Sequence, residues 1–68
     1  MRISIEVRAD KKLVVIFSVS REDTKYTFTK VVSTLNYYRL KQLEIAAIEA
    51  INRLIEEDNT MKVEVEKQ

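Results

Sequence analysis

The sequence predicts a small α+β domain in which one long helix packs on one face of a β-sheet. Three observations support this class. Three stretches in the first half of the chain alternate apolar and polar residues, which is the two-residue period of a strand. Residues 33–58 repeat their aliphatic side chains at the period of an amphipathic helix. The chain has 68 residues, so residues 1–68 are expected to form a single domain.

The first predicted strand covers residues 1–9, where Ile3, Ile5 and Val7 alternate with polar side chains. This alternation indicates one buried face, which we expect to lie against the helix. Residues 10–12 are polar and predict a turn. Because no glycine is present, we expect a hairpin connection slightly longer than a two-residue turn.

The second predicted strand, residues 13–20, is apolar on both faces. A strand of this kind usually has a central position in its sheet. Its larger apolar face consists of Leu13, Val15, Phe17 and Val19, and Val14 and Ile16 lie on the other face.

A charged turn at residues 21–24 leads into the third predicted strand, residues 25–31, with Tyr26 and Phe28 on one face. Ser33 or Thr34 is a candidate helix N-cap. Asn36 is the alternative, and it would leave Leu35 outside the helix.

The long helix is expected to end at Glu57 or Asp58, with residues 58–59 taking the place of the absent glycine. Tyr37 is expected to face the core. The predicted core stripe consists of Leu40, Leu43, Ala47, Ile48, Ala50, Ile51, Leu54 and Ile55.

Residues 61–66 alternate again and predict a fourth strand. The order is then β-β-β-α-β, and a right-handed crossover would place the fourth strand parallel to the first. The expected result is a four-stranded mixed sheet of order 3-2-1-4 with the helix on one face.

Composition excludes most enzyme chemistry. The chain has no histidine and no cysteine, so it lacks an imidazole base, a thiolate nucleophile and the usual zinc ligands. Without glycine it cannot build a phosphate-binding loop of the P-loop or Rossmann kind. We therefore expect no enzyme activity, no cofactor and no metal site. No segment is long enough to span a membrane and no signal peptide is visible, so a cytoplasmic location is expected.

The charge is unevenly distributed. Residues 1–41 hold nine basic residues against four acidic ones, and residues 42–68 hold three against seven. An ordinary solvated surface explains this pattern, and so does a basic face that binds nucleic acid. The candidate nucleic-acid contacts are Lys11, Lys12, Lys30, Arg39 and Lys41.

The alanine-rich stretch from Ala47 to Ile51, followed by Leu54, resembles the helix of the partial RNase H-like fold found in HicB-type antitoxins. The resemblance implies the β-β-β-α-β topology and a toxin partner. The chain departs from that family at residues 21–24, where HicB-type domains carry glycine- and proline-containing turns. It also lacks their DNA-binding tail.

Glu44 interrupts the apolar stripe of the helix. It matches by position the metal-binding glutamate of catalytic RNase H domains, where aspartates on the first and fourth strands complete the site. Here the corresponding strand residues are aliphatic, so this resemblance does not extend to nuclease activity. Glu44 is expected either to reach solvent at the sheet edge or to pair with a nearby Lys or Arg.

The sheet face away from the helix has aliphatic and small side chains, and one helix cannot cover it. We expect a two-fold dimer or another protein to bind there. Tyr38 and Ile45 form a further exposed apolar pair on the back of the helix. The predicted function is a homodimeric, non-enzymatic protein–protein interaction module, and one version of this hypothesis is an antitoxin-like role. The alternative is a nucleic-acid-binding accessory protein that uses the basic N-terminal half. The candidate interface residues are Val14, Ile16, Thr27, Thr29, Val31, Tyr38 and Ile45.

Overall fold

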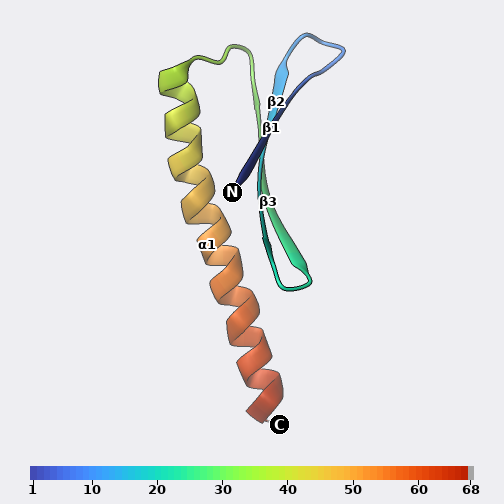
Figure 1. Cartoon of the computed structure of the whole chain (residues 1–68), viewed down its shortest axis with the longest axis vertical. Coiled ribbons are helices and arrows are strands. Elements are labelled where there is room, and N and C mark those ends of the chain that lie inside the picture. The colour runs from blue at the N-terminus through green and yellow to red at the C-terminus, as the bar shows by residue number, and fades with distance from the viewer. Residues whose placement is uncertain (68) are drawn as a thin grey trace.

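The computed structural model describes the backbone of residues 1–67 and the side chains of residues 1–59. An antiparallel sheet of order β1-β2-β3 is followed by one long helix, which runs along one face of the sheet (Figure 1). The predicted α+β class and its first three strands are confirmed. The elements are β1 (Arg2–Val7), β2 (Leu13–Arg21), β3 (Thr24–Val32) and α1 (Tyr37–Lys67).

The predicted fourth strand is wrong. Residues 61–66 continue α1, so the sheet has three strands within residues 1–67, and β1 lies at its edge. The expected helix end at Glu57 or Asp58 is wrong for the same reason. Neither Gly nor Pro follows Asp58, so no residue in this segment forces the backbone out of helical geometry. The helix consequently runs past the β2–β3 turn (Figure 1).

Both hairpin turns place a non-glycine residue at positive φ. In the β1–β2 loop, Lys11 has φ 67° and its N–H donates to the Arg8 carbonyl at 2.9 Å, while the Arg8 N–H donates to the Lys12 carbonyl at 2.8 Å. This is the three-residue loop with a left-handed last residue, longer than a two-residue turn as expected. In the β2–β3 turn, Glu22 has φ 56°.

Asn36 is the N-cap of α1, which confirms the alternative rather than Ser33 or Thr34. Its side-chain Oδ1 accepts the Arg39 N–H at 2.8 Å, and its carbonyl accepts the Leu40 N–H at 2.9 Å. These are the two bonds that a capping residue makes with the first helical turn. Leu35 lies outside the helix and packs against the core, half-buried.

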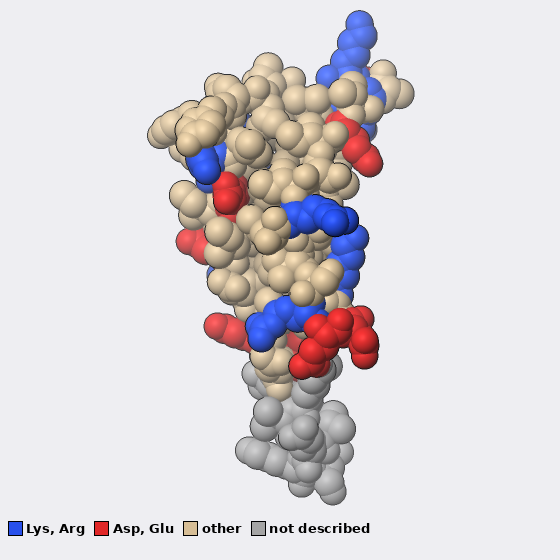
Figure 2. All heavy atoms as spheres, in the orientation of Figure 1, with Lys and Arg blue, Asp and Glu red and all other residues tan. Residues whose placement is uncertain are grey.

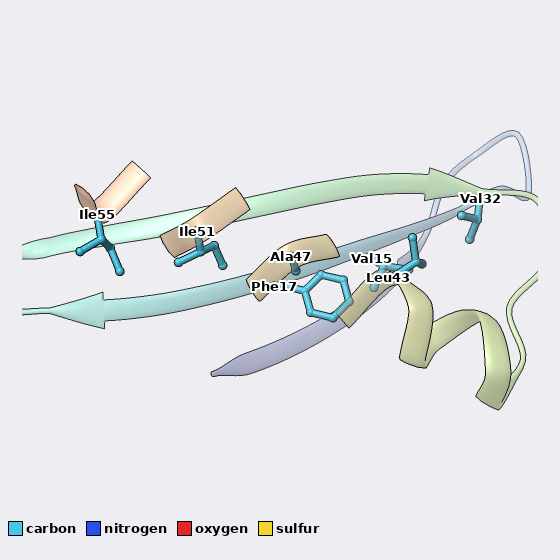
Figure 3. Packing of buried hydrophobic residues seen from close by; sticks show 7 residues of the cluster. All are labelled: Val15, Phe17, Val32, Leu43, Ala47, Ile51 and Ile55. Atoms are coloured by element: carbon cyan, nitrogen blue, oxygen red, sulfur yellow. The ribbon is translucent and has the colours of Figure 1, made fainter. Parts of the chain in front are cut away.

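The core lies between α1 and the β2–β3 hairpin (Figure 3). From Leu43 to Ile55 the helix buries every fourth residue of the predicted stripe, while Leu40 and Ala50 are half-buried and Ile48 and Leu54 are exposed at the flanks. The rings of Phe17 and Phe28 meet at a centroid distance of 6.1 Å. The buried cluster is Val15, Phe17, Val32, Leu43, Ala47, Ile51 and Ile55.

The helix packs on β3 and β2, and no described part of it packs on β1. An α-helix is about 10–12 Å wide, whereas neighbouring strands lie about 4.8 Å apart, so one helix covers about two strands. The remaining strand of the sheet, β1, is therefore left without a cover. No helix among the described residues is long and apolar enough to cross a lipid bilayer.

Candidate interaction surfaces

An exposed apolar strip runs along β1. Residues Ile3 and Ile5 pair with Phe17 and Val15, so their side chains lie on the helix-side face of the sheet, as predicted. They are not buried, however: the exposed fraction is 40% for Ile3, 49% for Ile5 and 72% for Val7. The expectation that the helix covers them is wrong, because the helix is centred over β2 and β3. With Met1, which is also exposed, these side chains form what we call the β1 strip.

The outer edge of β1 is open as well. Among the described residues β1 pairs only with β2, in an unbroken register from Arg2 to Val7. Natural edge strands are usually protected by proline, a bulge or charged side chains, especially lysine. β1 has no proline, bulge or lysine, and its charged residues Arg2 and Glu6 lie on the face away from the helix, so its backbone donors and acceptors and its apolar side chains are accessible together.

The opposite sheet face contains five of the predicted interface residues. The register pairs Val14 with Val31 and Ile16 with Thr29, which places them on the face away from the helix, together with Thr27. Val14 and Ile16 are half-buried by their neighbours on the adjacent strands, and the other three are exposed. We call this surface the open face. It exposes fewer large apolar groups than the β1 strip.

Tyr38 and Ile45, the other two predicted interface residues, lie on the outer side of α1. They are 72% and 60% exposed and lie about two turns apart along the helix. The predicted interface thus divides between opposite sides of the molecule, so it is not one surface. Tyr37, which was expected in the core, is also exposed, and the Lys41 Nζ lies 5.4 Å from its ring centroid.

The predicted nucleic-acid contacts do not form one group. Lys11 and Lys12 lie in the β1–β2 loop, Lys30 in β3, and Arg39 and Lys41 at the start of α1. Figure 2 shows Lys and Arg side chains in several separate groups on the face drawn, with acidic side chains between them. The arrangement of these described residues lacks the continuous basic stripe that tracks a nucleic-acid backbone.

Glu44 pairs with a nearby lysine, which is one of the two arrangements expected of it. Its carboxylate lies 3.6 Å from the Lys41 Nζ, and its side chain is 31% exposed. A partly solvated pair of this kind contributes little to stability. Among the described side chains, no group of three or more carboxylates forms a metal-binding arrangement around it or elsewhere.

The sequence contains one signal of the β1 strip that the predicted topology obscured. A fourth strand beside β1 would have made β1 central and covered its edge. Comparing the number of predicted strands with the width of one helix indicates that part of the sheet lacks a cover, since one helix covers about two strands.

No protein-family model matches the chain, and no curated protein or solved structure matches it.

Proposed function

We propose that the protein is a non-enzymatic protein–protein interaction module and that it acts as a homodimer. The observation that carries this proposal is the β1 strip, an apolar surface that continues the core of the sheet but has no cover among the described residues. Contiguous exposed apolar surface beside a folded core is typical of protein interaction sites.

The size of the chain supports the same proposal. A domain of this length buries a small fraction of its surface, and self-association is a common way to bury more. The described core has seven buried apolar side chains, while ten large apolar residues are exposed within residues 1–59. Burying part of that exposed surface in a second copy would add to the stability of the fold.

The proposed function contains neither an antitoxin role nor nucleic-acid binding. The resemblance to HicB-type antitoxins depends on a topology with a fourth strand, and the sheet within residues 1–67 contains three. The basic side chains are dispersed, and Lys41 is paired with Glu44. Neither alternative is favoured by a specific contact or surface of the described residues.

Sedimentation velocity at micromolar to high micromolar concentration tests the proposal. We expect the wild-type chain to sediment as a dimer and Ile5→Ser to shift toward a folded monomer, because Ile5 lies at the middle of the strip. Circular dichroism checks that the variant keeps its secondary structure.

Ile45→Ser is the matched control, because it makes the same change at an exposed isoleucine on the outer side of α1. It is expected to sediment like the wild type. A wild-type chain that remains monomeric at high micromolar concentration would contradict the proposed function.

A further inference from the structure

The backbone groups of β1 that point away from the sheet belong to its apolar residues. The Arg8 N–H donates to the Lys12 carbonyl, so Arg8 and Lys12 form a hydrogen-bonded pair at the end of the β1–β2 ladder. In an antiparallel ladder these pairs alternate with non-hydrogen-bonded ones. The even-numbered residues of β1 therefore bond to β2, and Ile3, Ile5 and Val7 direct their N–H and C=O groups to the open edge.

We propose that β1 pairs with β1 of a second copy, antiparallel and in the register that places Ser4 opposite Ser4. In this register Ile3 of each copy lies opposite Ile5 of the other. Both residues present their backbone groups outward, so they form hydrogen-bonded pairs across the two-fold axis. Two three-stranded sheets become one continuous sheet. This inference rests on the proposed homodimeric function and specifies the surface that forms it.

Charge favours this register over those centred nearer the β1–β2 loop, and a register centred on Ile3 would leave Arg2 and Glu6 without opposite charges. With Ser4 opposite Ser4, Arg2 of each copy faces Glu6 of the other, which gives two pairs of opposite charges. A register centred on Ile5 would place Arg2 opposite Arg8, and one centred on Glu6 would place Glu6 opposite itself. Like charges directly opposite each other destabilise a strand pair. The sequence Arg-Ile-Ser-Ile-Glu of residues 2–6 is thus complementary to its own antiparallel copy.

Within one copy, Arg2 and Glu6 cannot pair with each other. Four residues along a strand separate them by about 13 Å. Neither makes an ion pair with another described side chain, so both charges are accessible to a second copy. Ser4 suits the centre, because the two strands approach most closely at a non-hydrogen-bonded pair and a small side chain fits there.

The other edge strand of the sheet, β3, differs from β1 in the cover of its apolar face and in its charged residues. β3 has the helix over its inner face and carries Lys25 and Lys30, the lysines that commonly protect an edge from pairing. β1 has an uncovered apolar face and a self-complementary charge pattern. A two-fold axis through the β1 edge places both helices on the same face of the joined sheet, with Ile3 and Ile5 of both copies side by side between them.

Disulfide trapping tests the register. The chain has no cysteine of its own, so each introduced cysteine can crosslink only with its copy in the second chain. Ser4→Cys would bring two thiols together at a Cα separation of about 4.5–5 Å, which a disulfide can span. We expect rapid and nearly complete covalent dimer under mild oxidation. Glu6→Cys is the register control: its two copies would be separated by about 13 Å along the strands, so we expect little crosslinking.

Thr29→Cys is the surface control, because Thr29 lies on the open face. Crosslinking through Thr29→Cys but not through Ser4→Cys would show that the dimer forms face to face and would overturn the inference. A sedimenting dimer in which neither cysteine crosslinks would also overturn it, while leaving the proposed homodimeric function intact. A monomeric wild-type chain would contradict both.

Charge variants provide a second measurement that does not depend on oxidation. Arg2→Glu places two glutamates opposite each other in each pair, and Glu6→Arg places two arginines opposite each other. Each variant alone should therefore dimerise about tenfold more weakly than the wild type. When the two variants are mixed, every opposed pair has opposite charges. We expect the mixture to recover wild-type affinity as a heterodimer, and a mixture no tighter than either variant alone would overturn the register.

Discussion

The Tyr26 hydroxyl donates a hydrogen bond to Asp58 Oδ2 at 2.6 Å, joining β3 to α1 across 32 positions of the sequence. This bond raises the pKa of Tyr26 above its ordinary value of 10.0, and burial and the negative charge of Asp58 raise it further. The contact lies at the end of the sheet next to the β2–β3 turn, beyond the last buried residue of the described helix, Ile55. It therefore fixes the part of α1 that leaves the sheet.

The stability contributed by this bond is expected to be lost at high pH. Since the pKa of Tyr26 is higher in the folded state than in the unfolded state, the contribution is fully present below about pH 10. It declines as the pH rises through the higher folded-state pKa. We expect the difference in unfolding midpoint between the wild type and Tyr26→Phe to shrink above about pH 10 in a thermal unfolding series. A difference that stays constant through that range would contradict the assignment.

Below about pH 10, Tyr26→Phe is expected to lower the thermal unfolding midpoint, because it removes the donor to Asp58 and leaves the ring in place. Tyr38→Phe is the matched control, since it removes the same hydroxyl from an exposed position on the outer side of α1. We expect the control to unfold like the wild type. Equal midpoints for Tyr26→Phe and the wild type would show that the bond does not stabilise the fold.

The cap of the helix predicts a second effect. Asn36→Ala removes the acceptor of the Arg39 N–H, and we expect it to lower the free energy of unfolding by about 1 kcal/mol in urea denaturation. Thr34→Ala tests the position that the sequence offers as another cap, and the structure predicts a much smaller loss there. A larger loss at Thr34 than at Asn36 would contradict the observed start of α1.

The β1–β2 loop predicts a stabilising substitution. Lys11 has φ 67°, a conformation that costs a residue with a Cβ roughly 1–2 kcal/mol and costs glycine little. Lys11→Gly is therefore expected to raise the free energy of unfolding by up to about 1 kcal/mol, after the greater unfolded-state entropy of glycine is subtracted. Lys12→Gly makes the same change in charge at a residue without positive φ, so it should be destabilising. A loss of stability from both would contradict this account.

Local patterns predicted the local structure of this chain well. The alternation around Phe17 and Phe28 indicated two of the strands, and the polar residues near Asn36 formed a short set of candidate caps that includes the observed one. These features depend on a few neighbouring residues. The prediction for residues 61–66 failed, because alternation alone does not require a strand when nothing in the sequence ends the preceding helix.

Features that depend on distant parts of the chain could not be predicted in this way. The face of β1 was assigned correctly, but whether Ile5 is covered depends on the width and position of a helix about forty residues later. The bond between Tyr26 and Asp58 likewise depends on where the helix crosses the sheet. The error in the burial of β1 is linked to the error in the fourth strand, since a strand beside β1 would have made β1 a central strand of the sheet.

The buried stripe of α1 predicts a contrast between two isoleucines on the same helix. Ile51 is 2% exposed and Ile48 is 44% exposed, although both belong to the stripe predicted from the sequence. Ile51→Val is expected to lower the free energy of unfolding by about 0.5–1.5 kcal/mol, because it leaves space in the core that the fold cannot fully close. Ile48→Val changes helix propensity in the same way but removes a methyl group that water reaches, so its loss should be clearly smaller. Urea denaturation at one fixed protein concentration keeps the contribution of dimerisation the same for both variants. Equal losses would mean that α1 is rotated relative to the sheet, so that Ile48 and Ile51 are equally buried.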